Sequence, residues 1–463
     1  MASTEPPRAV TIHEHCRIAP PSHGGAEQLS LPLVFFDMVW LHFHPIQRLL
    51  FYQIPCSNQH FMETLIPNIK KSLSQTLKHF RPLAGNLIYP LKSGKPEFRY
   101  IPGDSVSVAI AESNEASDFH YLTGDDPRDA DRFYDLVPVL PPPENDSVSG
   151  FKRIPVFAVQ ITLFRDTGIC LGFTNHHAVG DASSIVGFIK AWSSVSMLEA
   201  ASELSAANFP LPFYDRSVVK DPSGLENTFW SQINISRIES LPLNFPTNKV
   251  RATYTLSKND IKKLKKLVQA KKPGLVHLSS FTITAAYVWT CLVKSAAEAG
   301  EEVDDNEPAY FVFAVDARQR LDPPVPAAYF GNCVAFGMTE STHGQLKVEN
   351  GFSVAVELIG EVISKRVNNK DGILRDAESW VSKFAGLVRK RAMGVAGSPR
   401  FDLYDTEFGW GKPKKYEVVS IDPSESMSLC KSRELENGLE IGLSLPEKKM
   451  SSFAAVFSAG LKI

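Results

Sequence analysis

The segment from Asn175 to Asp181, NHHAVGD, holds the side chains best suited to chemistry in this sequence. It follows the apolar run GICLGFTN, which predicts a buried strand, and its small residues predict a tight turn. Packing of the strand would hold a reactive side chain in that turn rigid. A neutral imidazole is the natural general base near neutral pH. We therefore interpret His177 as a candidate general base, with Asp181 either orienting it or fixing the loop by pairing elsewhere.

Spacing alone leaves other interpretations of this segment open. A His-x-x-x-Asp pattern is common by chance, so a surface turn with a satisfied core histidine is the more frequent outcome. A metal site would use His176, His177 and Asp181 as ligands. Adjacent residues at a strand end point to opposite faces, and no H-E-x-x-H motif or second acidic cluster supplies further ligands. We therefore expect no metal here.

A second unusual segment, TEFGWGKP, runs from Thr406 to Pro413. Two glycines around a tryptophan suggest a backbone that approaches another element closely, with aromatic rings in the core. We interpret this segment as structural. Its notable residues are Glu407, Phe408, Gly409, Trp410 and Gly411.

A third segment, DARQRLDPP, leaves an apolar strand and runs on into YFGNC. Its Arg318 could pair with a loop carboxylate such as Asp181 or Glu407, because a planar guanidinium binds both carboxylate oxygens. Cys333 could act as a nucleophile, but no local basic neighbour lowers the pKa of its thiol. We therefore expect a buried structural cysteine.

The composition bounds the class of protein. A chain of 463 residues suggests two or three domains. Its 49 basic and 51 acidic residues leave a net charge of −2, without the basic excess that nucleic-acid binding needs. No apolar run approaches the roughly 20 residues of a membrane helix, and the first residues lack the apolar region of a secretory signal. Six dispersed cysteines without a C-x-x-C pair fit a reducing compartment, so we expect the cytosol.

The elements that position these segments form two α/β halves. Strands are predicted over 10–19, 30–40, 154–165 and 168–175, and helices over 61–80 and the stretch after Asp181. The second half is predicted to hold helices from 258 and from 280, strands at YFVFAVD and FGNCVAFGMTE, and a hairpin and helix at the end. Periodicity is lost from about 201 to 236. We predict an N-terminal domain over 1–204, a crossover linker over 205–236 and a C-terminal domain over 237–463.

HHAVGD, DARQRLDPPVPAAYFGNC and EFGWGKP together resemble the BAHD family of plant acyl-CoA-dependent acyltransferases. LPLVFFD near residue 31 and FRPLAGN at residue 80 extend this resemblance over essentially the whole chain. YFGNC, the stretch around EFGWGKPKK and the ending GLEIGLSL look like the branch that acylates anthocyanin, flavonoid and other phenolic glycosides, and most like its malonyltransferases. Glu407 departs from the family, which usually has Asp there.

The resemblance implies a two-domain α/β fold of the chloramphenicol-acetyltransferase type, with a channel at the domain interface. His177 would be the catalytic base, reached by donor and acceptor from opposite sides. Asp181 would turn away from His177 and pair with an arginine, for which we choose Arg318 over Arg320. EFGWG would be structural and remote from the reacting atoms.

The resemblance also implies the substrates. The donor would be malonyl-CoA, the acceptor a glucose 6″-hydroxyl of a phenolic glycoside, and no cofactor would be required beyond the acyl-CoA co-substrate. The alternative is a hydroxycinnamoyl donor such as coumaroyl-CoA, since the shared motifs serve both. A malonyl carboxylate needs a cation, for which Lys190 and Arg400 are candidates. We expect a monomer.

Overall fold

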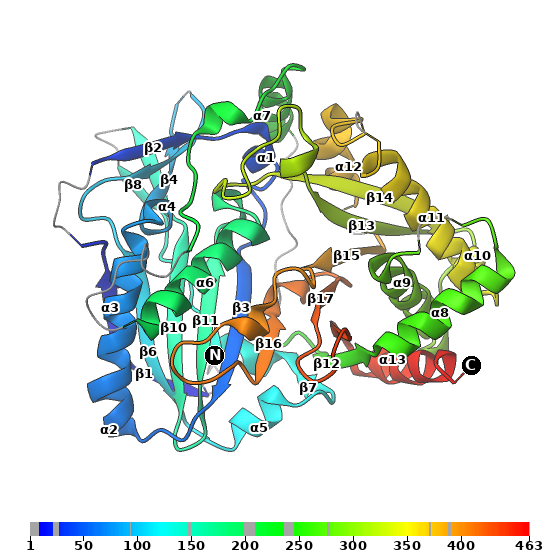
Figure 1. Cartoon of the computed structure of the whole chain (residues 1–463), viewed down its shortest axis with the longest axis horizontal. Coiled ribbons are helices and arrows are strands. Elements are labelled where there is room, and N and C mark those ends of the chain that lie inside the picture. The colour runs from blue at the N-terminus through cyan, green and yellow to red at the C-terminus, as the bar shows by residue number, and fades with distance from the viewer. Residues whose placement is uncertain are drawn as a thin grey trace, which may run out of the picture.

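The computed structural model describes residues 9–21, 27–92, 94–146, 150–198, 209–235, 245–275, 278–369, 372–387 and 390–462. These residues form three β-sheets and the helices around them. Figure 1 shows the N-terminal half on the left and the C-terminal half on the right, with strands β15 to β17 between them. The predicted α/β architecture with two halves is confirmed.

The N-terminal half is built on a six-stranded sheet. Its strands in spatial order are β1 (Val10–Ile18), β6 (Val106–Ser113), β10 (Phe157–Phe164), β11 (Gly168–Asn175), β3 (Ile46–Gln53) and β16 (Lys415–Val418). Every residue of β10 and β11 is buried, as expected for central strands covered on both faces. Helix α6 (Ala182–Met197) follows β11 and packs on α3 (Ile66–Leu77), where the Trp192 indole donates to Ser72.

The C-terminal half is built on a seven-stranded sheet. Its order is β14 (Val334–Thr342), β13 (Pro308–Asp316), β15 (Ala392–Ala396), β17 (Met427–Lys431), β18 (Leu439–Pro446), β12 (Lys249–Leu256) and β7 (Arg128–Asp129). Helices α8 (Lys258–Lys271), α9 (Ser280–Glu298), α11 (Gly351–Arg366) and α13 (Glu447–Gly460) pack with one another and with these strands. Helix α8 begins with a capping box in which Ser257 and Asp260 bond each other's backbone N–H groups.

The smaller elements complete the list. A five-stranded sheet has the order β2 (Leu29–Pro32), β5 (Glu97–Tyr100), β4 (Asn86–Pro90), β9 (Phe151–Pro155) and β8 (Glu144–Asp146). The remaining helices are α1 (Phe35–Met38), α2 (Asn58–His60), which runs through a π-turn into α3, α4 (Arg81–Ala84), α5 (Asp118–Thr123), α7 (Leu225–Ile235), α10 (His343–Lys347) and α12 (Trp380–Leu387). No helix in the described ranges is both long and apolar enough to cross a bilayer.

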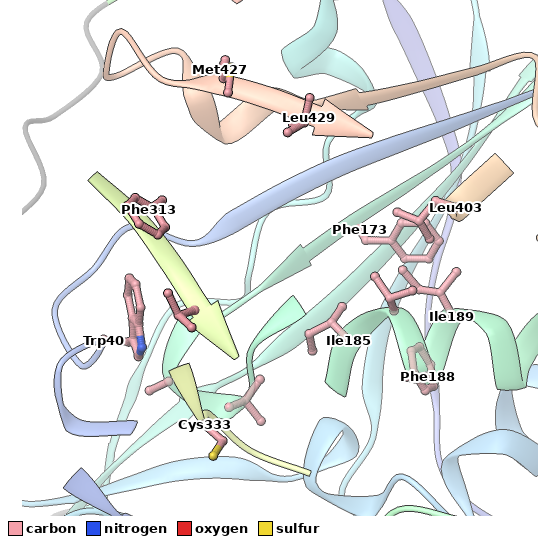
Figure 2. Close-up of a cluster of buried hydrophobic side chains, with 14 of the residues drawn as sticks. Trp40, Phe173, Ile185, Phe188, Ile189, Phe313, Cys333, Leu403, Met427 and Leu429 are labelled. Carbon is pink, nitrogen blue, oxygen red and sulfur yellow. The ribbon is translucent and has the colours of Figure 1, made fainter. Parts of the chain in front are cut away.

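Each half of the chain contributes one strand to the sheet of the other half. β16, from the C-terminal half of the chain, pairs with β3, and β7, from the N-terminal half, pairs with β12. Buried charges join the exchanged strands: Glu417 on β16 accepts from Arg128 on β7 and from Arg251 on β12. The largest hydrophobic cluster also takes side chains from both halves, among them Phe173, Phe313 and Met427 (Figure 2). The two halves therefore share one continuous interior.

Two sequence-based expectations need correction. The predicted strand over 30–40 ends at Pro32, because the buried Asp37 carboxylate accepts the backbone N–H of Val34 and closes the helical turn α1. The predicted linker contains regular structure, because residues 225–235 at its C-terminal end form α7 and Phe213 pairs with Tyr329. Residues 205–208 and 236 of that linker lie outside the described residues.

Candidate active site

His177 lies where β11 passes into α6. The buried strand ends at Asn175, and the N–H of His176 donates to the carbonyl of Val156, the residue before β10, at 2.8 Å. One 3-10 turn, His177–Val179, follows. Asp181 then caps α6, with its carboxylate accepting the N–H of Ser184 at 3.1 Å. The imidazole is thus fixed between a strand end and a helix start, as the sequence predicted.

Two aromatic side chains hold the His177 ring. The indole of Trp40 stacks on it face to face, with ring centroids 3.7 Å apart and an angle of 3° between the planes. The ring of Phe43 meets it edge-on, at 5.4 Å and 90°. His177 is half-buried, but its Nδ1 atom is fully covered and has no hydrogen-bond partner on another described residue. Other atoms of His177, and not Nδ1, therefore account for its exposed surface.

Burial lowers the pKa of His177 to about 3, because a charged imidazole loses its hydration there. A hydrogen bond to its own backbone carbonyl and the charge of Asp181 oppose this shift, while Arg48 and His44 add to it. Since Nδ1 is fully covered, Nε2 is the ring nitrogen left to accept a proton from a substrate. The ring is neutral at ordinary pH and can accept a proton.

Asp181 pairs with Arg318, the arginine chosen from the resemblance. Arg318 donates from Nη1 to Oδ2 at 2.8 Å and from Nη2 to Oδ1 at 3.1 Å, and both side chains are buried. The N–H groups of Ser184 and Cys333 bind the two oxygens as well, each at 3.1 Å. A carboxylate has about four lone-pair sites, so these four bonds leave none for His177. Asp181 therefore braces the loop and does not orient the base.

Arg318 and Arg320 have different surroundings. Arg318 also donates to the carbonyls of Tyr329 and Gly331, which ties the YFGNC segment to the Asp181 loop. Arg320 donates to the backbone carbonyl of Asp316 and is half-exposed. Asp181 is therefore paired with Arg318 and not with Arg320.

A second buried carboxylate, Asp37, holds the other side of the loop. Its Oδ1 accepts the backbone and side-chain N–H groups of Asn332, at 2.9 and 3.1 Å. The same Asn332 amide donates to the carbonyls of His177 and Ala178, at 3.1 and 3.0 Å. Arg216 from the crossover segment lies 3.5 Å from Oδ2 of Asp37. Asn332 therefore positions the turn that carries the imidazole.

Sequence reasoning assigned no role to Asp37, Asn332, Arg216 or Trp40. The segments LPLVFFD and YFGNC, which contain Asp37 and Asn332, were used only to support the family resemblance. One usable signal was present, because an aspartate that closes an apolar run such as LPLVFF must find partners when it is buried. Nothing local could identify Asn332 as that partner, 295 positions away in the chain.

Cys333 is fully buried, and burial raises the pKa of its thiol. A protonated, inaccessible thiol cannot attack a substrate, which agrees with the predicted structural role. The described residues contain no group of three or more His, Cys, Asp or Glu side chains arranged to hold a metal ion.

The EFGWG segment packs on the opposite end of α6 from Asp181. The ring of Phe408 meets Trp192 edge-on at 5.2 Å, and its carbonyl accepts from Ser196. Trp410 packs on Tyr52 of β3 at 5.5 Å. Gly409 and Gly411 take φ angles of +89° and +81°, which favour glycine. Glu407 is half-buried, and its carboxylate has no hydrogen bond or ion pair within the described ranges.

Lys190 and Arg400, the candidates for a carboxylate-binding cation, lie apart from His177. Lys190 is nine residues beyond Asp181 on α6, a rise of about 14 Å. Its charge acts on Asp405, whose pKa is lowered chiefly by a hydrogen bond from Lys412 and secondarily by Lys190. Arg400 is exposed, and no ion pair in the described part of the chain involves it.

Comparison with known proteins agrees with this geometry. A profile described as the Transferase family matches residues 8–459. A malonyl-coenzyme:anthocyanin 5-O-glucoside-6'''-O-malonyltransferase from Salvia splendens is 47% identical, over 97% of this chain and 95% of its own. Phenolic glucoside malonyltransferase 1 from Nicotiana tabacum is 45% identical, over 97% and 99%. A coumaroyl-CoA:anthocyanidin 3-O-glucoside-6''-O-coumaroyltransferase from Arabidopsis thaliana is 35% identical, over 100% and 99%.

Solved structures share the fold. Vinorine synthase superposes with a TM-score of 0.69 at 19% identity, covering 96% of each chain. TRI101 from F. sporotrichioides gives a TM-score of 0.62 at 15% identity, covering 92% of this chain and 97% of its own. These similarities confirm the predicted two-domain fold class. On its sequence relatives and its architecture, the chain belongs to the Transferase family of acyl-CoA-dependent acyltransferases, the BAHD family that its motifs resemble.

Proposed function

We propose that this protein transfers the malonyl group of malonyl-CoA to a sugar hydroxyl, the glucose 6″-hydroxyl, of an anthocyanin or other phenolic glucoside. The carrying observation is the neutral His177 imidazole, stacked on Trp40 and free of any bond to Asp181. The relatives at 45–47% identity are named malonyltransferases of such glucosides, which supports the donor and the acceptor.

The reaction needs one base and no covalent acyl-enzyme. Nε2 of His177 accepts the hydroxyl proton as the sugar oxygen attacks the thioester carbonyl. The C–O bond forms, the tetrahedral oxyanion collapses, and the C–S bond breaks. His177 then returns the proton to the CoA thiolate. The oxyanion requires a hydrogen-bond donor for an efficient reaction.

The family resemblance also supports the route of the substrates, the absence of a cofactor, the oligomeric state and the location. Donor and acceptor enter a channel at the domain interface from opposite sides and form a ternary complex at His177. No cofactor takes part besides the acyl-CoA co-substrate. The protein acts as a monomer in the cytosol.

A hydroxycinnamoyl donor is the second candidate, because a relative at 35% identity is named a coumaroyltransferase. The two candidates are separated by steady-state kinetics of the purified protein with malonyl-, coumaroyl- and acetyl-CoA and a flavonoid glucoside. We expect malonyl-CoA to have the highest kcat/KM, at least about tenfold above coumaroyl-CoA, if one charge-assisted contact discriminates them. A higher kcat/KM for coumaroyl-CoA would replace the malonyl assignment with the second candidate.

The pH dependence of kcat/KM should reflect the lowered pKa of His177. An imidazole with the reference pKa of about 6.5 would lose about tenfold of its neutral form at pH 5.5. With its pKa lowered to about 3, His177 stays neutral there, so kcat/KM at pH 5.5 should be within about twofold of its value at pH 7.5. An apparent pKa near 6.5 in the kcat/KM profile would contradict this environment.

The pH profile of kcat/KM needs a control for unfolding at low pH. A histidine whose pKa is depressed by folding stabilises the folded state above its unfolded pKa, and this contribution is lost as the pH falls from about 6.5 toward 3. Enzyme held at pH 5.5 is therefore assayed again at pH 7.5. Full recovery shows that any change in rate at pH 5.5 did not come from irreversible unfolding, and a circular dichroism spectrum at pH 5.5 that matches the one at pH 7.5 excludes reversible unfolding.

A further inference from the structure

A malonyl donor, unlike an acetyl donor, brings a carboxylate to the reacting centre. Only one methylene separates this carboxylate from the thioester carbonyl, so it must lie within a few ångströms of the atoms that His177 serves. It stays ionised near neutral pH, and burying it without a partner is strongly unfavourable. A cation with free donors therefore has to stand beside His177.

Four other basic residues can be compared as partners for this carboxylate, and each is either paired with a carboxylate of the protein or poorly placed. Arg318 is bound to Asp181, and Arg216 faces Asp37. Lys190 lies about 14 Å along α6 from the loop, and Arg400 is exposed. These four residues are therefore poor partners for a malonyl carboxylate.

Arg48 differs from them in its position. It lies on β3, in register with Phe173 of β11, and its Nη1 donates at 3.1 Å to the side chain of Asn175. Asn175 is the last residue of β11, two positions before His177. On its other flank Arg48 pairs with Val418 of β16, the strand lent by the C-terminal half. Its guanidinium thus sits at the end of the strand that delivers the imidazole, where the two halves meet.

Arg48 also differs from Arg216 and Arg318 in having no carboxylate partner in the described part of the chain. The guanidinium is half-buried, and none of its nitrogens is both fully covered and unpaired. It bonds the side chains of Asn175 and Tyr416, which leaves at least two of its five N–H groups for a ligand. Two adjacent N–H donors with a fixed, planar geometry match a carboxylate.

The electrostatics agree with this proximity. After burial and the residue's own carbonyl, the Arg48 charge is the largest influence on the pKa of His177, and it lowers that pKa. Burial raises the pKa of Tyr416 on β16, and both the charge of Arg48 and a hydrogen bond with it oppose that shift.

We propose that Arg48 binds the carboxylate of the malonyl donor through N–H groups of its guanidinium that Asn175 and Tyr416 leave over, and so determines the preference for malonyl-CoA. This inference rests on the proposed function. Asn175 orients the guanidinium through Nη1. A neutral donor would leave the cation unpaired, which disfavours it relative to malonyl-CoA.

The test compares kcat/KM for malonyl-CoA and acetyl-CoA in the wild type, Arg48→Met and Arg48→Lys. In Arg48→Met the ratio of malonyl to acetyl should fall by roughly 10- to 150-fold, the loss of one charge-assisted contact, while acetyl transfer is retained. Arg48→Lys should recover part of the ratio, because it keeps the charge without the planar pair of donors. The matched control is Arg165→Met, at the opposite end of β11, which should leave the ratio unchanged.

Acetyl transfer by the variants is the internal control for folding. Equal losses with both donors, or a change confined to the KM of the acceptor, would overturn the assignment of Arg48. If Arg48→Met does not fold, Arg48→Gln, which can still donate to Asn175, carries the same comparison. A wild type that transfers neither donor, or shows no malonyl preference, contradicts the proposed function itself, which is a different outcome from an unchanged ratio in the variants.

Discussion

Replacing His177 with alanine should lower kcat by about 10²- to 10⁴-fold or more, the usual effect of removing a general base. The structure offers no substitute at this position, since Asp181 has its oxygens filled by four other donors. Binding of the donor should change little, because the base acts on the hydroxyl of the acceptor. Single-turnover kinetics and direct measurement of CoA affinity separate the two quantities.

His176→Ala is the control for this loss. The His176 side chain faces inward and its Nδ1 accepts the N–H of Ala178, so it supports the turn without facing substrate. Its removal should lower the melting temperature and reduce activity less than removal of His177. Retention of more than about a tenth of the wild-type kcat in His177→Ala would contradict the assigned role. Equal losses at both positions would mean that the other histidine is the base.

Local patterns were sufficient for much of the fold. A continuous apolar run predicted β11, and local periodicity predicted the helices α3, α8 and α9. These features depend on neighbours within one turn or one strand, which a sequence displays directly. The same holds for the turn at His177, because an apolar strand that ends in small polar residues leaves few alternatives.

The parts that could not be predicted depend on distant pairing. The exchange of β16 and β7 between the two sheets has no local mark, since four and two residues of strand carry too little pattern. The contact of Asn332 with Asp37 and the His177 turn is equally invisible, because three separate segments make it. The Asp181 and Arg318 pair was foreseen only through family resemblance; spacing alone left Glu407 as an equal partner.

Breaking the Asp181 and Arg318 pair should lower the stability of the folded protein strongly, and more than removing the guanidinium of Arg320. Both side chains are buried, at 4% and 2% exposure, and removing one partner of a buried pair leaves the other uncompensated. The expected cost is about 3–5 kcal/mol for Asp181→Asn or Arg318→Ala, measured as a loss in unfolding free energy and melting temperature. Arg320→Ala, which removes a half-exposed guanidinium bonded to a backbone carbonyl, should cost much less.

The double variant tests whether the two residues act through one contact. If they do, Asp181→Asn combined with Arg318→Ala should be little less stable than either single variant, so the coupling energy should approach the cost of one substitution. Activity should fall together with stability, because the carboxylate holds the turn through Ser184 and Cys333 and makes no bond to His177. Additive losses would exclude the pairing as the source of the effect. Activity lost at unchanged melting temperature would instead assign Asp181 to orienting the imidazole, which four filled bonding sites on its carboxylate argue against.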